Sequence, residues 1–116
     1  MVVDSELASS VLDGLFQALS DATRRDILRR TVEHGDSVSV LASRYSMSFA
    51  AVQKHVRVLE RAALVTKERR GREQIVHANG ATMRRVATLL DDYEQLWIHR
   101  AEQIEEILET QEREKA

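Results

Sequence analysis

Basic and amide side chains recur at helical spacing between residues 44 and 61, and they could bind nucleic acid. A Gln can bond adenine through two hydrogen bonds, a Lys can donate to guanine, and an Ala methyl can meet a thymine methyl. On a helix over 49–62, one face would carry Ala50, Lys54, Arg57 and Arg61, flanked by Gln53. We therefore predict base contacts by Ala50, Gln53 and Lys54; the alternative is a solvated face that reads no base.

A second set of side chains is suited to phosphates, which fix position without reading sequence. The predicted DNA backbone contacts are Arg44, Ser48, Arg57 and Arg61. A further group surrounds Gly71 in the pattern 64-LVTKERRGREQIVH, namely Lys67, Arg69, Arg70 and Arg72. Arg70 and Arg72 flank the expected tip and could enter a minor groove, where narrow A·T tracts attract arginine. A solvated hairpin tip is the alternative.

Charge is distributed unevenly along the chain, although the net charge is only −2. Residues 44–72 hold eight basic and two acidic side chains, whereas residues 91–116 hold nine acidic and three basic ones. The first segment would attract phosphates, and the second would point away from them or orient docking.

A helix-turn-helix followed by a hairpin would position these side chains. Two short helices are expected at 40–45, capped by Ser39, and at 49–62, capped by Ser48. The second helix would bury Phe49, Val52, Val56, Leu59 and Ala63; groove contact is the alternative for Phe49. The hairpin would turn near Gly71, with arms at 64–69 and 73–77. This order predicts a winged helix-turn-helix.

The remaining chain is predicted to be helical. One helix begins at Val11, after a frayed start, and the next is capped by Ser20 or Asp21 and ends at Gly35. That helix should turn Ile27, Leu28 and Val32 inward. A last helix spans about 81–110, with a frayed tail at 111–116, and its apolar stripe is too long for a small core to cover. A second copy of the chain is the simplest partner.

Composition sets the broad class. With 116 residues, 43% hydrophobic, no proline and no cysteine, the chain is expected to be a single winged-helix domain over 1–116, with its core at about 11–80. The fold class is mainly α with a small β-hairpin. No membrane-length apolar run or leader is present, so a soluble, cytoplasmic protein is expected. No phosphate loop, nucleophile elbow or HExxH motif is found, so no enzyme and no cofactor are expected.

Four stretches resemble the ArsR-type family of bacterial winged-helix regulators: 15-LFQALSDATRRDIL, 38-VSVLASRYSMS, 49-FAAVQKHVRVLERAALV and 69-RRGREQIVH. The resemblance implies a homodimer, a recognition helix at 49–62, a wing at 64–77 and transcriptional control, usually repression, at an inverted-repeat operator. It implies that the first and last helices form the interface, where the candidates are Leu12, Leu15, Phe16, Leu90, Tyr93, Trp97 and Ile104. An unknown small-molecule inducer is a further partner to expect.

Two alternatives stay open. Members that sense metals often carry Cys-x-Cys where this chain has Ser37-Val38-Ser39, or Asp-x-His where it has Asp91-Asp92-Tyr93, so no metal site is predicted. A metal-responsive repressor could still use His99, Glu102 and Glu106, which share one helical face. From a different class, the chain could be a winged-helix protein-interaction module that does not bind DNA.

Overall fold

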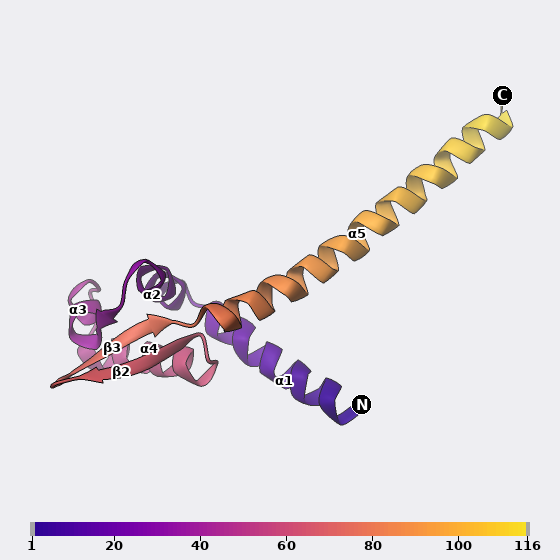
Figure 1. Cartoon of the computed structure of the whole chain (residues 1–116). Coiled ribbons are helices and arrows are strands. Elements are labelled where there is room, and N and C mark those ends of the chain that lie inside the picture. The colour runs from indigo at the N-terminus through magenta and orange to yellow at the C-terminus, as the bar shows by residue number, and fades with distance from the viewer. Residues whose placement is uncertain (1, 116) are drawn as a thin grey trace. The chain divides into compact units, whose positions relative to one another are not determined.

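The structure is a computed structural model that describes residues 2–115, with the side chains of 9–115. Its elements follow the order α1, α2, β1, α3, α4, β2, β3, α5 (Figure 1). Their contacts divide the chain into two compact units, Met1–Met83 and Arg84–Ala116. The mainly helical class with a small sheet is confirmed.

Two helices open the first unit. Helix α1 spans Val2–Leu19 and so begins nine residues earlier than Val11, the predicted start. Helix α2 spans Ala22–Glu33, and Asp21 caps it by accepting a hydrogen bond from the Arg24 amide at 3.1 Å. Val32 was wrongly expected inside, since it is 64% exposed. Because successive helical residues lie about 100° apart, a buried face centred on Ile27 and Thr31 turns Val32 outward.

The helix-turn-helix consists of α3 (Val38–Ser43) and α4 (Phe49–Arg61). The cap predicted at Ser39 is wrong. Strand β1 (Asp36–Ser37) leads straight into α3, and the Ser37 hydroxyl accepts from the Val40 amide at 3.1 Å. The cap predicted at Ser48 is confirmed, because its hydroxyl accepts from the Ala51 amide at 3.1 Å. Two serine caps thus define where the helices begin.

A three-stranded antiparallel sheet, in the order β1-β3-β2, completes the first unit. Strands β2 (Val65–Arg70) and β3 (Glu73–Ala78) form the predicted hairpin, whose turn holds Gly71 at φ 62°. Ser37 pairs with Ile75 in the sheet and also caps α3. Before β1, Gly35 has no room for a side chain, since a Cβ there would lie 2.6 Å from the His77 ring.

Aliphatic side chains from most elements of the first unit form its core. Those less than 2% exposed include Leu15, Ile27, Leu41, Val52, Val56, Leu59, Leu64, Val65 and Val76. Leu15 was expected at a dimer interface, but at 1% exposure it belongs to the core of its own protomer. Its place on α1 between Ala18 and Leu12 explains this, because the buried side of the helix passes through Leu15 and Ala18.

The end of α4 has a well-defined stop. Ala63 adopts φ 60°, its amide donates to the Glu60 carbonyl at 2.9 Å, and the Leu64 amide donates to the Leu59 carbonyl at 3.0 Å. This pair of bonds is the Schellman motif, which satisfies the last carbonyls of a helix. Leu59 and Leu64 are both fully buried, as the hydrophobic contact of that motif requires. The left-handed position is normally a glycine, and here alanine adopts it.

The second unit is helical throughout its described residues. It continues α5, which spans Gly80–Lys115, so residues 111–115 extend the helix and do not fray as predicted. Large apolar side chains on this unit are exposed, with Tyr93 at 61% and Trp97 at 71%. No helix of the described chain is long and apolar enough to cross a membrane.

We predict that Ala63→Gly stabilises the protein. The left-handed conformation costs an alanine roughly 1 kcal/mol relative to glycine, so the free energy of unfolding should rise by about that amount. Urea denaturation followed by circular dichroism would measure it. Ala62→Gly is the matched control, because Ala62 has φ −81° and the same substitution there should destabilise. A destabilised Ala63→Gly variant would contradict the argument.

Candidate nucleic-acid interface

Helix α4 has one buried and one open side. Val52, Val56 and Leu59 are fully buried. On the other side, Ala50, Lys54, Arg57 and Arg61 are exposed, and Gln53 is half-buried at the margin. The structure therefore brings the predicted base-contact residues together on one helix, with two of the predicted phosphate contacts directly beyond them.

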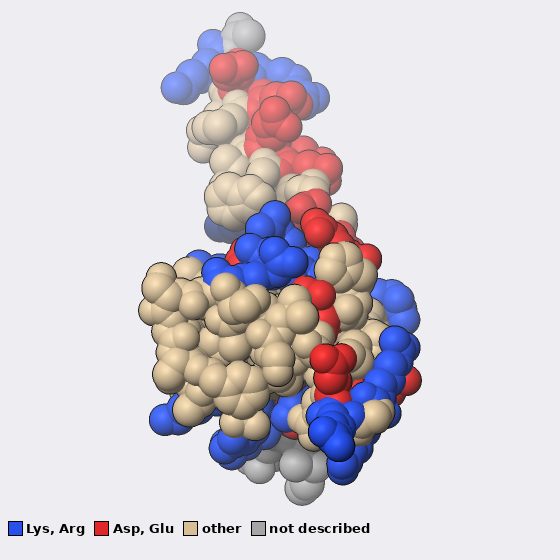
Figure 2. Space-filling view, turned by 90° about the vertical axis from the view of Figure 1, so that its left-hand side faces the viewer, with Lys and Arg blue, Asp and Glu red and all other residues tan. Residues whose placement is uncertain are grey.

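The first turn of α4 and the turn before it carry no charge. From Tyr45 to Gln53 the sequence has no charged residue, while Arg44 and Lys54 stand at either end, both exposed. Viewed from the side where Figure 1 shows α3 and the hairpin tip, a broad uncharged surface is bordered by Lys and Arg side chains above and below and by Asp and Glu side chains on its right (Figure 2). Arg44 and Ser48, the other predicted phosphate contacts, are exposed at this turn.

The hairpin presents its arginines at the tip and fixes its lysine at the base. Arg69, Arg70 and Arg72 are exposed. Lys67 differs, because its side chain is only 17% exposed and its ammonium lies 3.4 Å from the Glu60 carboxylate of α4. This pair ties the hairpin to the helix, so Lys67 contributes more to the placement of the wing than to its free charge.

Glu68 modulates the charge of the same hairpin. Its carboxylate accepts from Arg70 at 3.2 Å and lies 3.0 Å from the His77 Nε2. Arg70 foremost, and then His77, lower the pKa of Glu68, so it stays ionised and partly neutralises Arg70. Within the described residues, Arg72 has no such carboxylate partner and is the less encumbered cation at the tip.

A hollow of about 310 Å³ separates the start of α4 from the hairpin. It is lined by Ser37, Val38, Ser39, Phe49, Gln53, Arg69, Arg72, Glu73 and Gln74. Phe49 was expected in the core, but it is 50% exposed and forms one wall of this hollow. The reason is its place as the first residue of α4, where the helix extends past the layer that would cover it.

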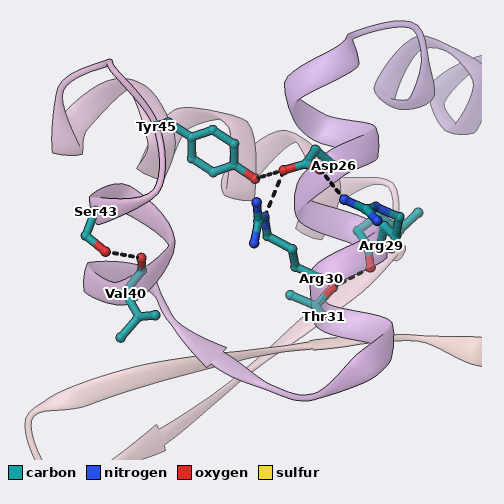
Figure 3. Close-up of polar contacts among 8 residues, drawn as sticks. Asp26, Arg29, Arg30, Thr31, Val40, Ser43 and Tyr45 are labelled. Carbon is teal, nitrogen blue, oxygen red and sulfur yellow. Dashed lines mark hydrogen bonds and ion pairs between the residues drawn. The ribbon is translucent and has the colours of Figure 1, made fainter.

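A carboxylate on α2 anchors the helix-turn-helix. Asp26 accepts hydrogen bonds from the Tyr45 hydroxyl at 2.5 Å, from Arg30 Nε at 2.9 Å and from Arg29 at 3.0 Å (Figure 3). Tyr45 follows α3 directly, and the Arg30 guanidinium lies 5.9 Å from the centre of its ring. These contacts join α2 to the turn that sets the angle between α3 and α4.

The protonation of this cluster is fixed across the physiological range. The hydrogen bond from Tyr45, followed by those from Arg30 and Arg29, holds the pKa of Asp26 well below its usual value. Burial, together with the bond to Asp26, raises the pKa of Tyr45 to about 12. Asp26 is therefore ionised and Tyr45 is a neutral donor at pH 7.

Arg24 of α2 links that helix to both α1 and α4. Its guanidinium donates to the Ala18 and Gln17 carbonyls at the end of α1, at 2.7 and 3.0 Å, and lies 3.2 Å from His55 Nδ1 on α4. His55 therefore contacts a neighbouring side chain within its own chain. Arg61 lines a hollow of about 430 Å³ on this side, with parts of α1 and α2.

Metal ligands are not assembled in the protomer. Among the described residues, no three His, Asp or Glu side chains lie close enough together to hold a metal ion. The alternative of a metal-responsive repressor that uses His99 and nearby carboxylates is therefore not supported by a cluster of ligands within one chain.

Comparison with known proteins places this geometry in a family. A family model described as a helix-turn-helix domain matches residues 19–68. An uncharacterized HTH-type transcriptional regulator of Bacillus subtilis, YuzN, is 34% identical over 79 residues, which are 62% of this chain and 86% of the relative. An ArsR-like transcriptional regulator from Rhodococcus sp. RHA1 superposes with a TM-score of 0.77 at 34% identity, over 86% of this chain and 94% of the other.

The chain belongs to the ArsR-like helix-turn-helix transcriptional regulators. Its function class is thus that of a DNA-binding transcriptional regulator. A homodimeric winged helix-turn-helix DNA-binding domain from Mycobacterium bovis shares the fold, with a TM-score of 0.65 at 18% identity over 77% of this chain and 83% of that one.

One part of this ArsR-like interface escaped sequence reasoning, and another was expected in the core. The cluster of Asp26 with Tyr45 joins residues 19 positions apart, and neither helical periodicity nor local spacing reports such a pair. For Phe49, burial was preferred to groove contact, although its place directly after the capping serine marks it as a first-turn residue, where burial is least complete.

We predict that Tyr45→Phe destabilises the protein by about 1 kcal/mol at pH 7, the usual net contribution of one hydrogen bond. Because the pKa of Asp26 is depressed in the folded state, its contribution is complete above the carboxyl's ordinary value of about 4 and is lost as the pH falls below it. Because variant and wild type share the same pKa of Asp26 in the unfolded state, the difference between them should stay at about 1 kcal/mol while Asp26 is ionised in both folded proteins. It should shrink only well below about pH 4, where the folded variant begins to bind a proton at Asp26.

Urea denaturation at pH 7, 5 and 3 measures this effect. Tyr93→Phe is the matched control, because Tyr93 is 61% exposed and the substitution should leave stability unchanged at each pH. A Tyr45→Phe variant that is as stable as wild type at pH 7 and 5 would argue against a stabilising bond to Asp26.

Proposed function

We propose that this regulator is a homodimeric repressor that binds an inverted-repeat operator through α4 and the hairpin. One observation carries the proposal. Helix α4 has a fully buried face on one side and, on the other side, an exposed face that holds Lys54 and Arg57. A helix held on one side and cationic on the other is suited to lie in a major groove.

The side chains divide into two roles. Gln53 and Lys54, with Ala50, are proposed to read base edges, since they lie on the first turns of α4. Arg44, Ser48 and Arg57 are proposed to bind phosphates on either side, and Arg61 to bind one at the far end of the helix. Arg70 and Arg72 at the hairpin tip are proposed to reach the neighbouring minor groove.

Self-association is proposed to use the exposed stripe of α5 together with Leu12 and Phe16 of α1. Leu90, Tyr93, Trp97 and Ile104 recur at intervals of three, four and seven residues and are 45–71% exposed. A surface of this kind is costly in water and is suited to a second helix. The domain from Mycobacterium bovis, which has the same fold and is homodimeric, supports self-association.

The charges of the second unit favour an antiparallel pair of helices. Parallel pairing would set its acidic segments side by side, residues 102–114 against their copies. Antiparallel pairing centred near Trp97 would bring Arg84 and Arg85 towards the acidic end of the partner helix instead. Opposite charges at such flanking positions set the orientation of paired helices.

A protein-interaction module without DNA binding remains the second candidate. It is disfavoured by the exposed cations of α4 and of the hairpin tip, because an interaction wing would more often present apolar side chains. A gel-shift assay with a pool of random duplexes distinguishes the two, since the module would retard no duplex.

We predict that Lys54→Ala lowers affinity for a duplex selected from a random pool about tenfold, while affinity for a scrambled duplex falls much less. Lys54 is proposed to donate to a base edge, so its loss should erase part of the discrimination. Fluorescence anisotropy titrations on the two duplexes measure the ratio. Equal losses on both would remove Lys54 as a base reader.

The double substitution of Arg70 and Arg72 by alanine is the comparison variant for Lys54→Ala. It removes two cations proposed to lie in the minor groove, of which Glu68 partly neutralises Arg70, so the slope of log affinity against log salt should become shallower by roughly one to two per protomer. The preference for the selected over the scrambled duplex should change little.

We predict that Trp97→Glu converts the dimer to monomer. A charge at the centre of the apolar stripe would be buried without a partner in the dimer, which strongly disfavours association. Sedimentation velocity measures the species present. Gln95→Glu is the matched control, because it adds the same charge two residues away on the opposite side of α5 and should leave the dimer intact.

A further inference from the structure

Phe49 is an aromatic side chain in an unusual place. It is the first residue of α4, directly after the capping Ser48, and half of its surface is exposed. The core of the first unit does not depend on it, because Val52, Val56 and Leu59 form the buried face of α4 and are each fully buried. The exposed half of its ring is therefore free to contact a ligand.

Along the chain, the neighbours of Phe49 are uncharged and partly apolar, whereas the hollow that it lines also contains Arg69, Arg72 and Glu73 of the hairpin. Met47 is 36% exposed just before it, and Ala50 is exposed just after it. Cations stand outside this group, with Arg44 before it and Lys54 after it. Single apolar residues on a surface are ordinary, but this cluster lies at the part of a recognition helix that reaches base edges.

One group on the major-groove edge of DNA matches an exposed aromatic ring. The edges of the bases carry hydrogen-bond donors and acceptors, and the apolar exception is the C5 methyl of thymine. A ring that contacts this methyl removes apolar surface of both partners from water. Charged or polar base edges would instead be left without partners against the ring.

We propose that Phe49 reads the C5 methyl of a thymine in each half-site. The reading is assisted by Gln53, which lies one turn further along the same side of α4 and lines the same hollow of about 310 Å³. The amide of Gln53 is suited to an adenine, so the half-site carries a thymine that faces Phe49 and an A·T pair within one step of it.

This inference rests on the proposed DNA binding through α4 and adds to it the chemical group that is recognised. Loss of one methyl contact corresponds to about 0.8 kcal/mol per buried carbon, which is about a fourfold change in affinity. The effect is small enough to require a comparison that changes the methyl and nothing else.

Deoxyuridine provides that comparison, because it keeps the pairing and the hydrogen-bonding edge of thymidine and lacks only the methyl. The duplex would be the tightest one selected by wild-type protein from a random pool. Each thymine would be replaced singly by uracil, and affinity measured by fluorescence anisotropy. Wild type should lose about fourfold at one thymine in each half-site.

Phe49→Ala should bind the thymine duplex more weakly and should no longer distinguish uracil from thymine at that position. Phe49→Leu retains an apolar side chain and should keep most of the discrimination. Val32→Ala is the matched control, since it truncates a 64% exposed apolar residue on α2, outside the proposed DNA-contacting residues, and should behave as wild type. Thermal unfolding of each variant verifies that it is folded.

The outcomes separate the two proposals. If Phe49→Ala retains the full thymine–uracil difference, or if wild type shows none, the assignment to Phe49 is overturned while DNA binding stands. If the random pool yields no preferred duplex, the proposed operator binding fails and the inference fails with it.

Discussion

The buried face of α4 is the constraint on which the rest of the structure depends. Val52, Val56 and Leu59 are enclosed by the other elements of the first unit, and their burial holds the helix in one orientation. Each such side chain contributes roughly 1.5–3 kcal/mol when removed from water. Because the buried face fixes the helix, the cations on the opposite face are also held in fixed positions along α4.

Much of this could be predicted from the sequence because it is local. Helical spacing identified the two faces of α4, the serine at position 48 marked its start, and Gly71 marked the turn of the hairpin. Each of these depends on residues within a few positions of one another. The order of the helices and the hairpin then sufficed for the winged helix-turn-helix.

The errors arose where a tertiary partner decides. Ser37 and Ser39 are both good capping residues. Ser37 caps α3 because β1 pairs with β3 and ends at this residue. Leu15 follows the same periodicity as Leu12 and Phe16, but it is the one that reaches the protomer's own core. Ala63 was expected on the buried face of α4 but is exposed, because the helix ends at Arg61 and Ala63 adopts a left-handed conformation before the buried Leu64.

Ser37 also couples the position of the hairpin to that of α3. Ser37 is the last residue of β1 that pairs with β3, and its hydroxyl accepts the hydrogen bond that caps α3. No flexible linker therefore separates the sheet from the helix. Gly35, pressed against the His77 ring, closes the same junction from the other side. If the hairpin and α4 both contact DNA as proposed, a force on the hairpin would turn α3 as well, so the duplex would have to bend to reach both elements.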